Sequence, residues 1–215
     1  MTTTAFTSLL ENTTRTVSSG TRPEGMIKTV TLSRTFATSI DDAWDALTNP
    51  DRIPRWFQPV TGNLRLGGQY QIEGNAGGMI ERCDAPHAFA ATWEFAGQVS
   101  WIEVDLAAEG ADATRVTLNH IAPVSPHWDR YGPGAVGIGW DMSLLGLILH
   151  LDKAGTLAPE DAMGWMMSED GLAFMTRSNE LWAEADIANG EDAAKAQSAA
   201  ANTITFYTGA EEPCH

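Results

Sequence analysis

The chain has few cysteines and no recognisable metal-binding pattern. Only Cys83 and Cys214 occur among its 215 residues. Two thiols cannot build the disulfide framework of a small secreted domain, so we expect a reduced, cytoplasmic setting. There is no HExxH or CxxC, and the five histidines share no ligand spacing with one another or with Cys83. We therefore expect neither a metal ion nor a bound cofactor.

Long apolar runs are also scarce. The longest uncharged apolar run, residues 142–151, is about half of the roughly 20 residues that span a bilayer. A basic leader followed by an apolar core, which would mark a secretory signal, is missing from the first residues. Residues 1–27 are instead rich in Thr and Ser, which predicts a flexible segment. These features predict a soluble protein with no membrane partner.

Basic residues are outnumbered, with 13 Lys and Arg against 28 Asp and Glu and a formal net charge of −15. The imbalance is −6 over residues 28–158 and −9 over residues 159–215. An acidic surface repels phosphate backbones and anionic headgroups, which argues against nucleic acid as a partner. In the tail the charges alternate with Ala, Leu, Trp and Met, which is typical of a solvated helical face.

The first half of the chain predicts a strand, two short helices and a series of strands. Residues 28–38 alternate apolar and polar side chains, as a half-buried strand does. Ser39 followed by Asp42 resembles a capping box, and a short helix from there should end at Asn49, before a second helical turn at 51–56. Strands are predicted at about 63–73, 77–84, 88–96, 99–108 and 114–122. Their short connections imply an antiparallel meander with one dry face.

A long helix is predicted at 133–152, and it is apolar on two sides. One stripe consists of Trp140, Leu144, Leu147, Ile148 and Leu151, and the other of Ile138, Met142, Leu145 and Leu149. A helix of this kind is buried on two sides. One side can cover the sheet. The other requires either the helices predicted at about 159–207, which begin at Pro159 and break at Gly190, or a second subunit.

The fold class that follows is α+β. We predict a helix-grip fold, in which a curved antiparallel sheet of about six strands wraps around a long C-terminal helix, with additional C-terminal helices. The predicted division is a flexible segment at 1–27, the helix-grip domain at 28–155, and an acidic helical extension at 156–215 that packs on the long helix.

Several short motifs carry a resemblance to a known family. They are Ser39-Ile40-Asp41-Asp42-Ala43-Trp44-Asp45-Ala46-Leu47-Thr48-Asn49-Pro50, Arg55-Trp56-Phe57, Gly67-Gly68-Gln69-Tyr70, Gly78, Pro86, Thr92-Trp93, Thr114-Arg115-Val116-Thr117-Leu118-Asn119-His120 and Gly139-Trp140. Their order resembles the START-like (SRPBCC) superfamily, and more narrowly bacterial homologues of the C-terminal domain of the activator of the heat-shock ninety ATPase. The resemblance covers about residues 28–152. The tail from Pro159 departs from it.

The resemblance implies a cavity between sheet and long helix that binds a small hydrophobic or aromatic molecule, and that hosts catalysis in some relatives. The residues expected to line it are Trp56, Phe57, Tyr70, Ile72, Met79, Trp93, Trp101, His120, Trp140 and Leu144. Each aromatic residue among them, taken alone, is better explained as plain core, whereas the set together favours a cavity. His120 and Tyr70 are the candidates for moving protons, although no second residue is tied to His120 by sequence, and a strand histidine is often simply hydrogen-bonded to its neighbours.

Three functions follow in order of preference. The first is a carrier, sensor or sequestering protein for a small apolar or aromatic ligand, with a homodimer through the long helix or the C-terminal helices as an option. The second is an enzyme of the cyclase or hydratase type that uses the same cavity. The third is a protein-interaction module that resembles a co-chaperone.

Overall fold

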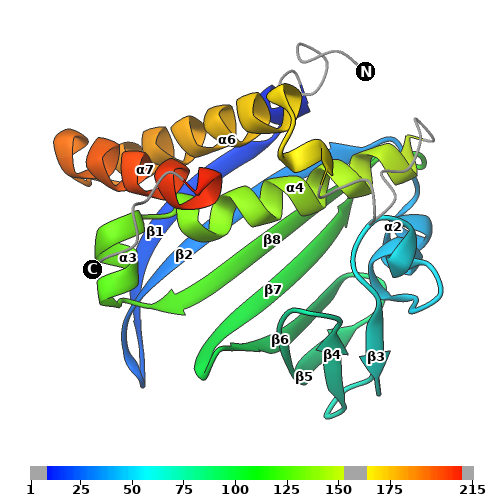
Figure 1. The fold of residues 1–215 in the computed structure, drawn as a ribbon. Coiled ribbons are helices and arrows are strands. Elements are labelled where there is room, and N and C mark those ends of the chain that lie inside the picture. Colours follow the sequence, from blue (N-terminus) through cyan, green and yellow to red (C-terminus); the bar gives the residue numbers. More distant parts are fainter. Residues whose placement is uncertain (1–8, 153–163, 210–215) are drawn as a thin grey trace. The chain divides into compact units, whose positions relative to one another are not determined.

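A computed structural model describes residues 9–152 and 164–209 of the chain and shows an α+β fold (Figure 1). The strands are β1 (Thr14–Arg22), β2 (Gly25–Phe36), β3 (Val60–Gly62), β4 (Gln69–Ile72), β5 (Gly77–Asp84), β6 (Ala88–Phe95), β7 (Gln98–Ala108) and β8 (Thr114–Pro123). The helices are α2 (Ile40–Thr48), the 3-10 helix η1 (Ile53–Arg55), α3 (Pro126–Tyr131), α4 (Gly134–Leu151), α6 (Glu169–Ala188) and α7 (Ala193–Thr208).

The strands form one antiparallel sheet in the order β1-β2-β8-β7-β6-β5-β4-β3. The predicted helix-grip fold is thereby confirmed, with eight strands in place of about six. By its contacts the chain divides into two compact units. Unit one holds Met1–Val30, Pro123–Met142 and Glu160–His215, and unit two holds Thr31–Ala122 and Ser143–Pro159. The division at residues 27 and 155 that the sequence suggests stays a prediction.

Helix α2 in unit two begins where the capping pattern places it. The Ser39 side chain accepts a hydrogen bond from the backbone N–H of Asp42, at 3.3 Å. The helix packs on the sheet through Trp44, whose ring meets Phe89 of β6 edge to face at a centroid distance of 6.0 Å. Its most buried side chain positions are Ala43 and Ala46, which let the helix backbone approach its neighbours closely.

The predicted strand at 63–73 is only partly observed, because residues 69–72 form β4, whereas residues 63–68 form a turn that separates it from β3. Strands β3 and β4 pair with each other in antiparallel register, with Gly62 opposite Tyr70. In the turn the backbone N–H of Arg65 donates to the carbonyl of Asn63, and that of Gly68 donates to the carbonyl of Arg65. In this turn, local backbone hydrogen bonds replace those between strands. The alternation of side chains in the sequence does not reveal this change.

In unit one, residues Thr14–Arg22 form strand β1, whereas the sequence led us to expect a flexible segment up to residue 27. The Thr-rich composition that suggested flexibility also favours strands, because threonine is β-branched. Val17 is buried, and Arg15 makes an ion pair with Asp141 of α4 that fixes the strand. Helix α3, which is capped by Ser125, was not predicted from the sequence.

Helix α4 confirms the predicted long helix to within a residue or two. Its most buried side chains come from both apolar stripes, as expected for a helix enclosed on two sides; they are Ile138, Leu145, Leu147, Ile148 and Leu149. By length and composition alone α4 is the one helix among the described residues that is able to cross a membrane. The core helix of a soluble domain has the same features, and α4 carries the buried, ion-paired Asp141.

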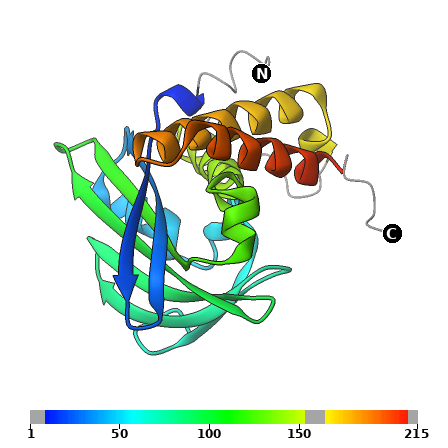
Figure 2. The same ribbon diagram turned by 90° about the vertical axis from the view of Figure 1, so that its left-hand side faces the viewer.

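The two C-terminal helices of unit one lie side by side (Figure 2). Helix α6 stops before Gly190, and α7 begins after its N-cap Asp192, so the predicted break at Gly190 is confirmed. The predicted helix start at Pro159 lies outside the described residues. Buried side chains of α6 include Phe174, Met175 and Trp182, which supply a core for this unit.

Candidate functional site

The ladders between β6, β7 and β8 sort their side chains onto two faces of the sheet. Ile102 pairs with Ala91 and His120, and the next residue, Trp101, pairs with Thr92 and Ile121. Because successive side chains of a strand point to opposite faces, His120 and Trp101 lie on opposite faces. We call the face that carries His120 the helix-facing face, because it also carries Phe89, the partner of Trp44 in α2.

A polar chain lies on this otherwise apolar face. The Nε2 atom of His120 lies 2.9 Å from the hydroxyl of Ser100, and that hydroxyl lies 3.1 Å from the carbonyl of Trp93. A carbonyl only accepts, so the Ser100 hydroxyl donates to Trp93 and accepts from His120, which assigns the proton to Nε2. The rings of Trp93 and His120 are 5.9 Å apart. The chain thus joins three neighbouring strands by side-chain contacts.

The imidazole of His120 is held in its neutral form. Only 5% of the residue is exposed, and burial lowers the pKa of His120 from 6.5 to about 4. At neutral pH the ring is therefore a neutral hydrogen-bonding group and a weak base. The charged side chains of the three strands lie on the opposite face. They are Glu94, Glu103, Asp105 and Arg115.

Tyr70 reaches the same region from β4. Its hydroxyl donates to the carbonyl of Thr92 in β6, at 2.6 Å, across the intervening strand β5. Gly78 of β5 is paired with Tyr70, and a Cβ atom there would lie 2.2 Å from the Thr92 carbonyl oxygen. A glycine is therefore needed at this crossing. Burial, followed by the nearby Glu94 carboxylate, raises the pKa of Tyr70, so its hydroxyl keeps its proton.

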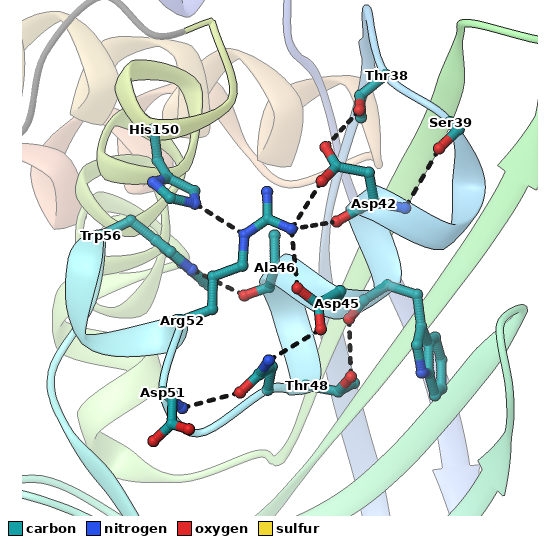
Figure 3. A network of polar contacts seen from close by, with 12 residues as sticks. Thr38, Ser39, Asp42, Asp45, Ala46, Thr48, Asp51, Arg52, Trp56 and His150 are labelled. Carbon is teal, nitrogen blue, oxygen red and sulfur yellow. Dashed lines mark hydrogen bonds and ion pairs between the residues drawn. The ribbon is translucent and has the colours of Figure 1, made fainter.

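A second polar cluster in unit two joins α2, the segment after it and the end of α4 (Figure 3). The Arg52 guanidinium donates from Nη1 to carboxylate oxygens of Asp42 at 2.7 Å and Asp45 at 3.0 Å, and from Nε to His150 Nε2 at 3.0 Å. The hydrogen bond from Arg52, followed by one from the Thr38 side chain, lowers the pKa of the Asp42 carboxyl. The cluster fixes how α2 and α4 meet.

The predicted cavity residues do not all share one face. Tyr70, Trp93 and His120 come together as described, whereas the register places Trp101 on the opposite face. Met79 is 44% exposed and pairs with Gln69, one position out of phase with Tyr70 and Gly78. These two assignments are corrected, because each followed from the residue type and not from its phase in the strand.

Of the remaining predicted residues, Ile72 lies two positions from Tyr70 in β4 and therefore on the same face of the sheet, whereas the others lie in α4 or after α2. In unit two Ile72 is buried in β4, Trp56 stacks beside Phe57 and donates to the carbonyl of Ala46, and Leu144 lies in the second half of α4. Trp140 lies in the first half of α4, in unit one. Their role in lining a ligand site stays a prediction.

Ser100 is the functional candidate that the sequence analysis missed. Nothing near it in the sequence resembles a catalytic motif, because its partner His120 is 20 residues away and on another strand. Within the described stretches 9–152 and 164–209, no three His, Cys, Asp or Glu side chains are grouped to hold a metal ion.

Comparison with known proteins identifies related sequences and folds. The family model for "Activator of Hsp90 ATPase homolog 1-like protein" matches residues 37–148. The chain is 30% identical to CalU16 from Micromonospora echinospora; the solution structure of CalU16 matches with a TM-score of 0.69 over 83% of this chain and 97% of CalU16. Its crystal structure gives a TM-score of 0.63 over 80% of this chain and 97% of CalU16. No curated protein matches the chain.

The similarity to CalU16 extends past the region of the family model. Coverage of 83% is about 178 of the 215 residues, whereas the family model accounts for 112 residues and is preceded by 36. At least about 30 of the matched residues therefore follow residue 148. A fold match to EF2215, a conserved protein of unknown function from Enterococcus faecalis, covers 87% of this chain and 96% of EF2215, with 15% identity and a TM-score of 0.57. At least part of the segment after residue 148 is thus shared with relatives.

Proposed function

The chain belongs to the family of Activator of Hsp90 ATPase homolog 1-like proteins, and we propose that it binds a small, uncharged, hydrophobic or aromatic molecule against the helix-facing face of its sheet. Members of this family and of the wider SRPBCC group bind ligands, act as cyclases or activate Hsp90. The observation that carries the proposal is the hydrogen-bonded chain from His120 through Ser100 to the Trp93 carbonyl.

The hydrogen-bonded series from His120 through Ser100 to the Trp93 carbonyl has the chemistry of a ligand anchor. Polar groups on an apolar surface fix the orientation of a ligand, and apolar neighbours supply most of the affinity. Here Ala91, Ile102 and Val104 lie on the same face of the sheet as the histidine, and the Trp93 ring lies beside it. The anchor is neutral, because burial keeps the His120 pKa at about 4. A ligand carboxylate would lose its hydration without gaining an opposite charge, so an uncharged ligand is favoured.

Native mass spectrometry tests whether a ligand is present. Protein purified without organic solvent should carry an additional mass, and extraction with organic solvent should remove it. Defined probes then test the chemistry: 1-naphthol, which is uncharged, should quench tryptophan fluorescence at lower concentration than 1-naphthoate, which is anionic at pH 7. Equal affinity for both probes would contradict the neutral anchor, and binding of neither would contradict the proposed site.

Two pairs of variants locate the probe. Ser100→Ala and His120→Phe should weaken 1-naphthol binding roughly tenfold, the equivalent of one lost hydrogen bond. Trp93→Phe should remove most of the fluorescence change, whereas Trp101→Phe should leave it in place because Trp101 lies on the opposite face. If Trp101→Phe abolishes the change and Trp93→Phe does not, the ligand lies on the other face of the sheet.

The same hydrogen bond supports a second candidate, a cyclase or hydratase. A serine and a histidine within hydrogen-bond reach can relay a proton. With a pKa of about 4, however, His120 is a weak base at neutral pH, and its Nε2 proton already points to Ser100. Binding without turnover is therefore the preferred function. Recovery of the co-purifying molecule in chemically altered form after incubation with fresh protein would favour the enzyme.

A further inference from the structure

Two contacts hold residues 49–57 of unit two against the second half of α4. The Arg52 Nε atom donates to His150 Nε2 at 3.0 Å. The Trp56 carbonyl oxygen lies so close to Gly146 that a Cβ atom on that glycine would be 2.2 Å from it. Gly146 and His150 are four residues apart and therefore lie on one face of the helix. The first contact depends on charge and the second does not.

The contact between Arg52 and His150 requires a neutral histidine. A guanidinium has only donor groups and stays protonated in proteins, so His150 Nε2 must offer a lone pair. A proton on that nitrogen would turn the bond into two donors that face each other, with two positive charges in contact. Burial, then Arg52 and Arg55, lower the pKa of His150 below its ordinary 6.5, which agrees with this geometry.

The charged groups around His150 are arranged so that protonation of His150 affects chiefly its contact with Arg52. From α2, Asp42 is the group that favours a protonated His150, but its carboxylate already accepts from Arg52 at 2.7 Å and from the Thr38 hydroxyl at 2.5 Å. Asp45 also accepts from Arg52, at 3.0 Å. Arg52 therefore keeps two carboxylate partners on α2 when His150 takes up a proton. Of the bonds from Arg52 that Figure 3 shows, the one to His150 on α4 is the one that this proton would break.

We propose that Arg52 and His150 form a pH-sensitive latch, which holds residues 49–57 against α4 near neutral pH and releases them in mildly acidic solution. In the released state Arg52 stays with Asp42 and Asp45 on α2, and the end of α4 separates from the segment. The latch does not depend on the proposed ligand site, because none of its groups belongs to the chain from His120 to Trp93.

Hydrogen–deuterium exchange at pH 7.5 and pH 5.5 tests the latch. After correction for the intrinsic pH dependence of exchange, amides of residues 49–57 should lose protection at pH 5.5 relative to pH 7.5, because a proton on His150 removes the bond from Arg52. In His150→Gln the amide oxygen accepts from Arg52 and does not titrate, so protection should stay constant. His87→Gln, which changes an exposed histidine of the same unit, should respond to pH as the unsubstituted protein does.

The outcomes separate clearly. Unchanged protection in the unsubstituted protein, or an equal response in His150→Gln, would overturn the latch. A ring-proton NMR titration of the unsubstituted protein supplies a second measurement that holds even if His150→Gln fails to fold. There His150 should titrate below 6.5 and in step with amide signals of residues 49–57. A titration at or above 6.5 also overturns the proposal.

Discussion

Arg15 and Asp141 lie 126 residues apart in the chain and form a buried ion pair, with Nη2 2.7 Å from Oδ1. Their side chains are 4% and 0% exposed. The second carboxylate oxygen accepts from the Ser178 hydroxyl at 2.6 Å and from the Trp182 indole N–H at 3.0 Å. The charge is thus fully compensated, and β1, α4 and α6 are joined at one carboxylate.

Loss of this carboxylate should destabilise the protein strongly. Asp141→Asn removes the negative charge and leaves the Arg15 guanidinium buried without its partner. Breaking a buried pair in this way costs about 3–5 kcal/mol of unfolding free energy. Urea denaturation followed by circular dichroism measures the change. The midpoint should fall well below that of the unsubstituted protein.

An exposed ion pair provides the matched control. Arg82 and Asp105 are 3.2 Å apart, and their side chains are 49% and 52% exposed. Asp105→Asn should therefore cost less than about 1 kcal/mol, since exposed pairs contribute little. Equal losses in Asp141→Asn and Asp105→Asn would mean that burial of the Arg15 pair has no energetic consequence.

Two glycines of α4 should respond to alanine in opposite ways. A Cβ atom on Gly146 would lie 2.2 Å from the Trp56 carbonyl oxygen, whereas one on Gly139 meets nothing within 4 Å. Gly146→Ala should cost about 1–3 kcal/mol as an overpacked site does. Gly139→Ala should raise the unfolding free energy by about 0.5–1 kcal/mol, because alanine is the better helix former. Thermal unfolding compares the two directly, and equal shifts would contradict the close approach at Gly146.

Patterns within short stretches were sufficient for much of the fold. The strand at 77–84 and the capped helix start at Ser39 follow from side chains within a few residues of one another, and both are observed. The Thr-rich start of the chain could not be interpreted in this way. Strand β1 depends on Arg15 meeting Asp141, and no local pattern predicts a contact between residues so far apart.

The candidate site was less accessible than the fold for the same reason. His120 was singled out by its residue type, but its partner Ser100 follows only from the register of β7 and β8. A shift of one residue in that register would exchange Ser100 for Trp101. The aromatic residue was therefore assigned to the site, and the serine was overlooked.

The stability of the protein should fall in acid because of His120. Burial lowers its folded pKa to about 4, whereas an unfolded chain has the ordinary 6.5. Above pH 6.5 both states are neutral. As the pH falls from 6.5 towards 4 the unfolded state binds the proton first, so stability is lost, by roughly 3 kcal/mol over the whole interval.

Urea unfolding at pH 7.5, 5.5 and 4.5 measures this loss, and a substitution isolates it. His120→Gln does not titrate, so its unfolding free energy should fall less steeply between pH 6.5 and 4.5. His87→Gln, at an exposed position, should retain the original slope. If the His120→Gln curve runs parallel to the other two, the histidine is not held neutral by burial.

Asp186 should show the reverse of Asp141 under the same substitution. It is 2% exposed, and none of the described residues donates to its Oδ1 atom. Burial raises the pKa of this carboxyl above its ordinary 3.8. It also lies at the C-terminal end of α6, where the helix dipole disfavours a negative charge. A raised folded pKa means that stability is highest at low pH and is lost as the pH rises from 3.8 through the folded pKa.

Asp186→Asn removes that loss of stability. At pH 7 the unfolding free energy of the variant should therefore be higher than that of the unsubstituted protein by more than about 0.5 kcal/mol, which is the usual scatter of neutral substitutions. The gain should shrink as the pH falls towards 3.8, where the original carboxyl is protonated in both states. Urea unfolding of Asp186→Asn and Asp141→Asn at pH 7 and pH 4 provides the comparison. If Asp186→Asn destabilises the protein at pH 7 as Asp141→Asn does, then Asp186 is a compensated charge in solution and the prediction is contradicted.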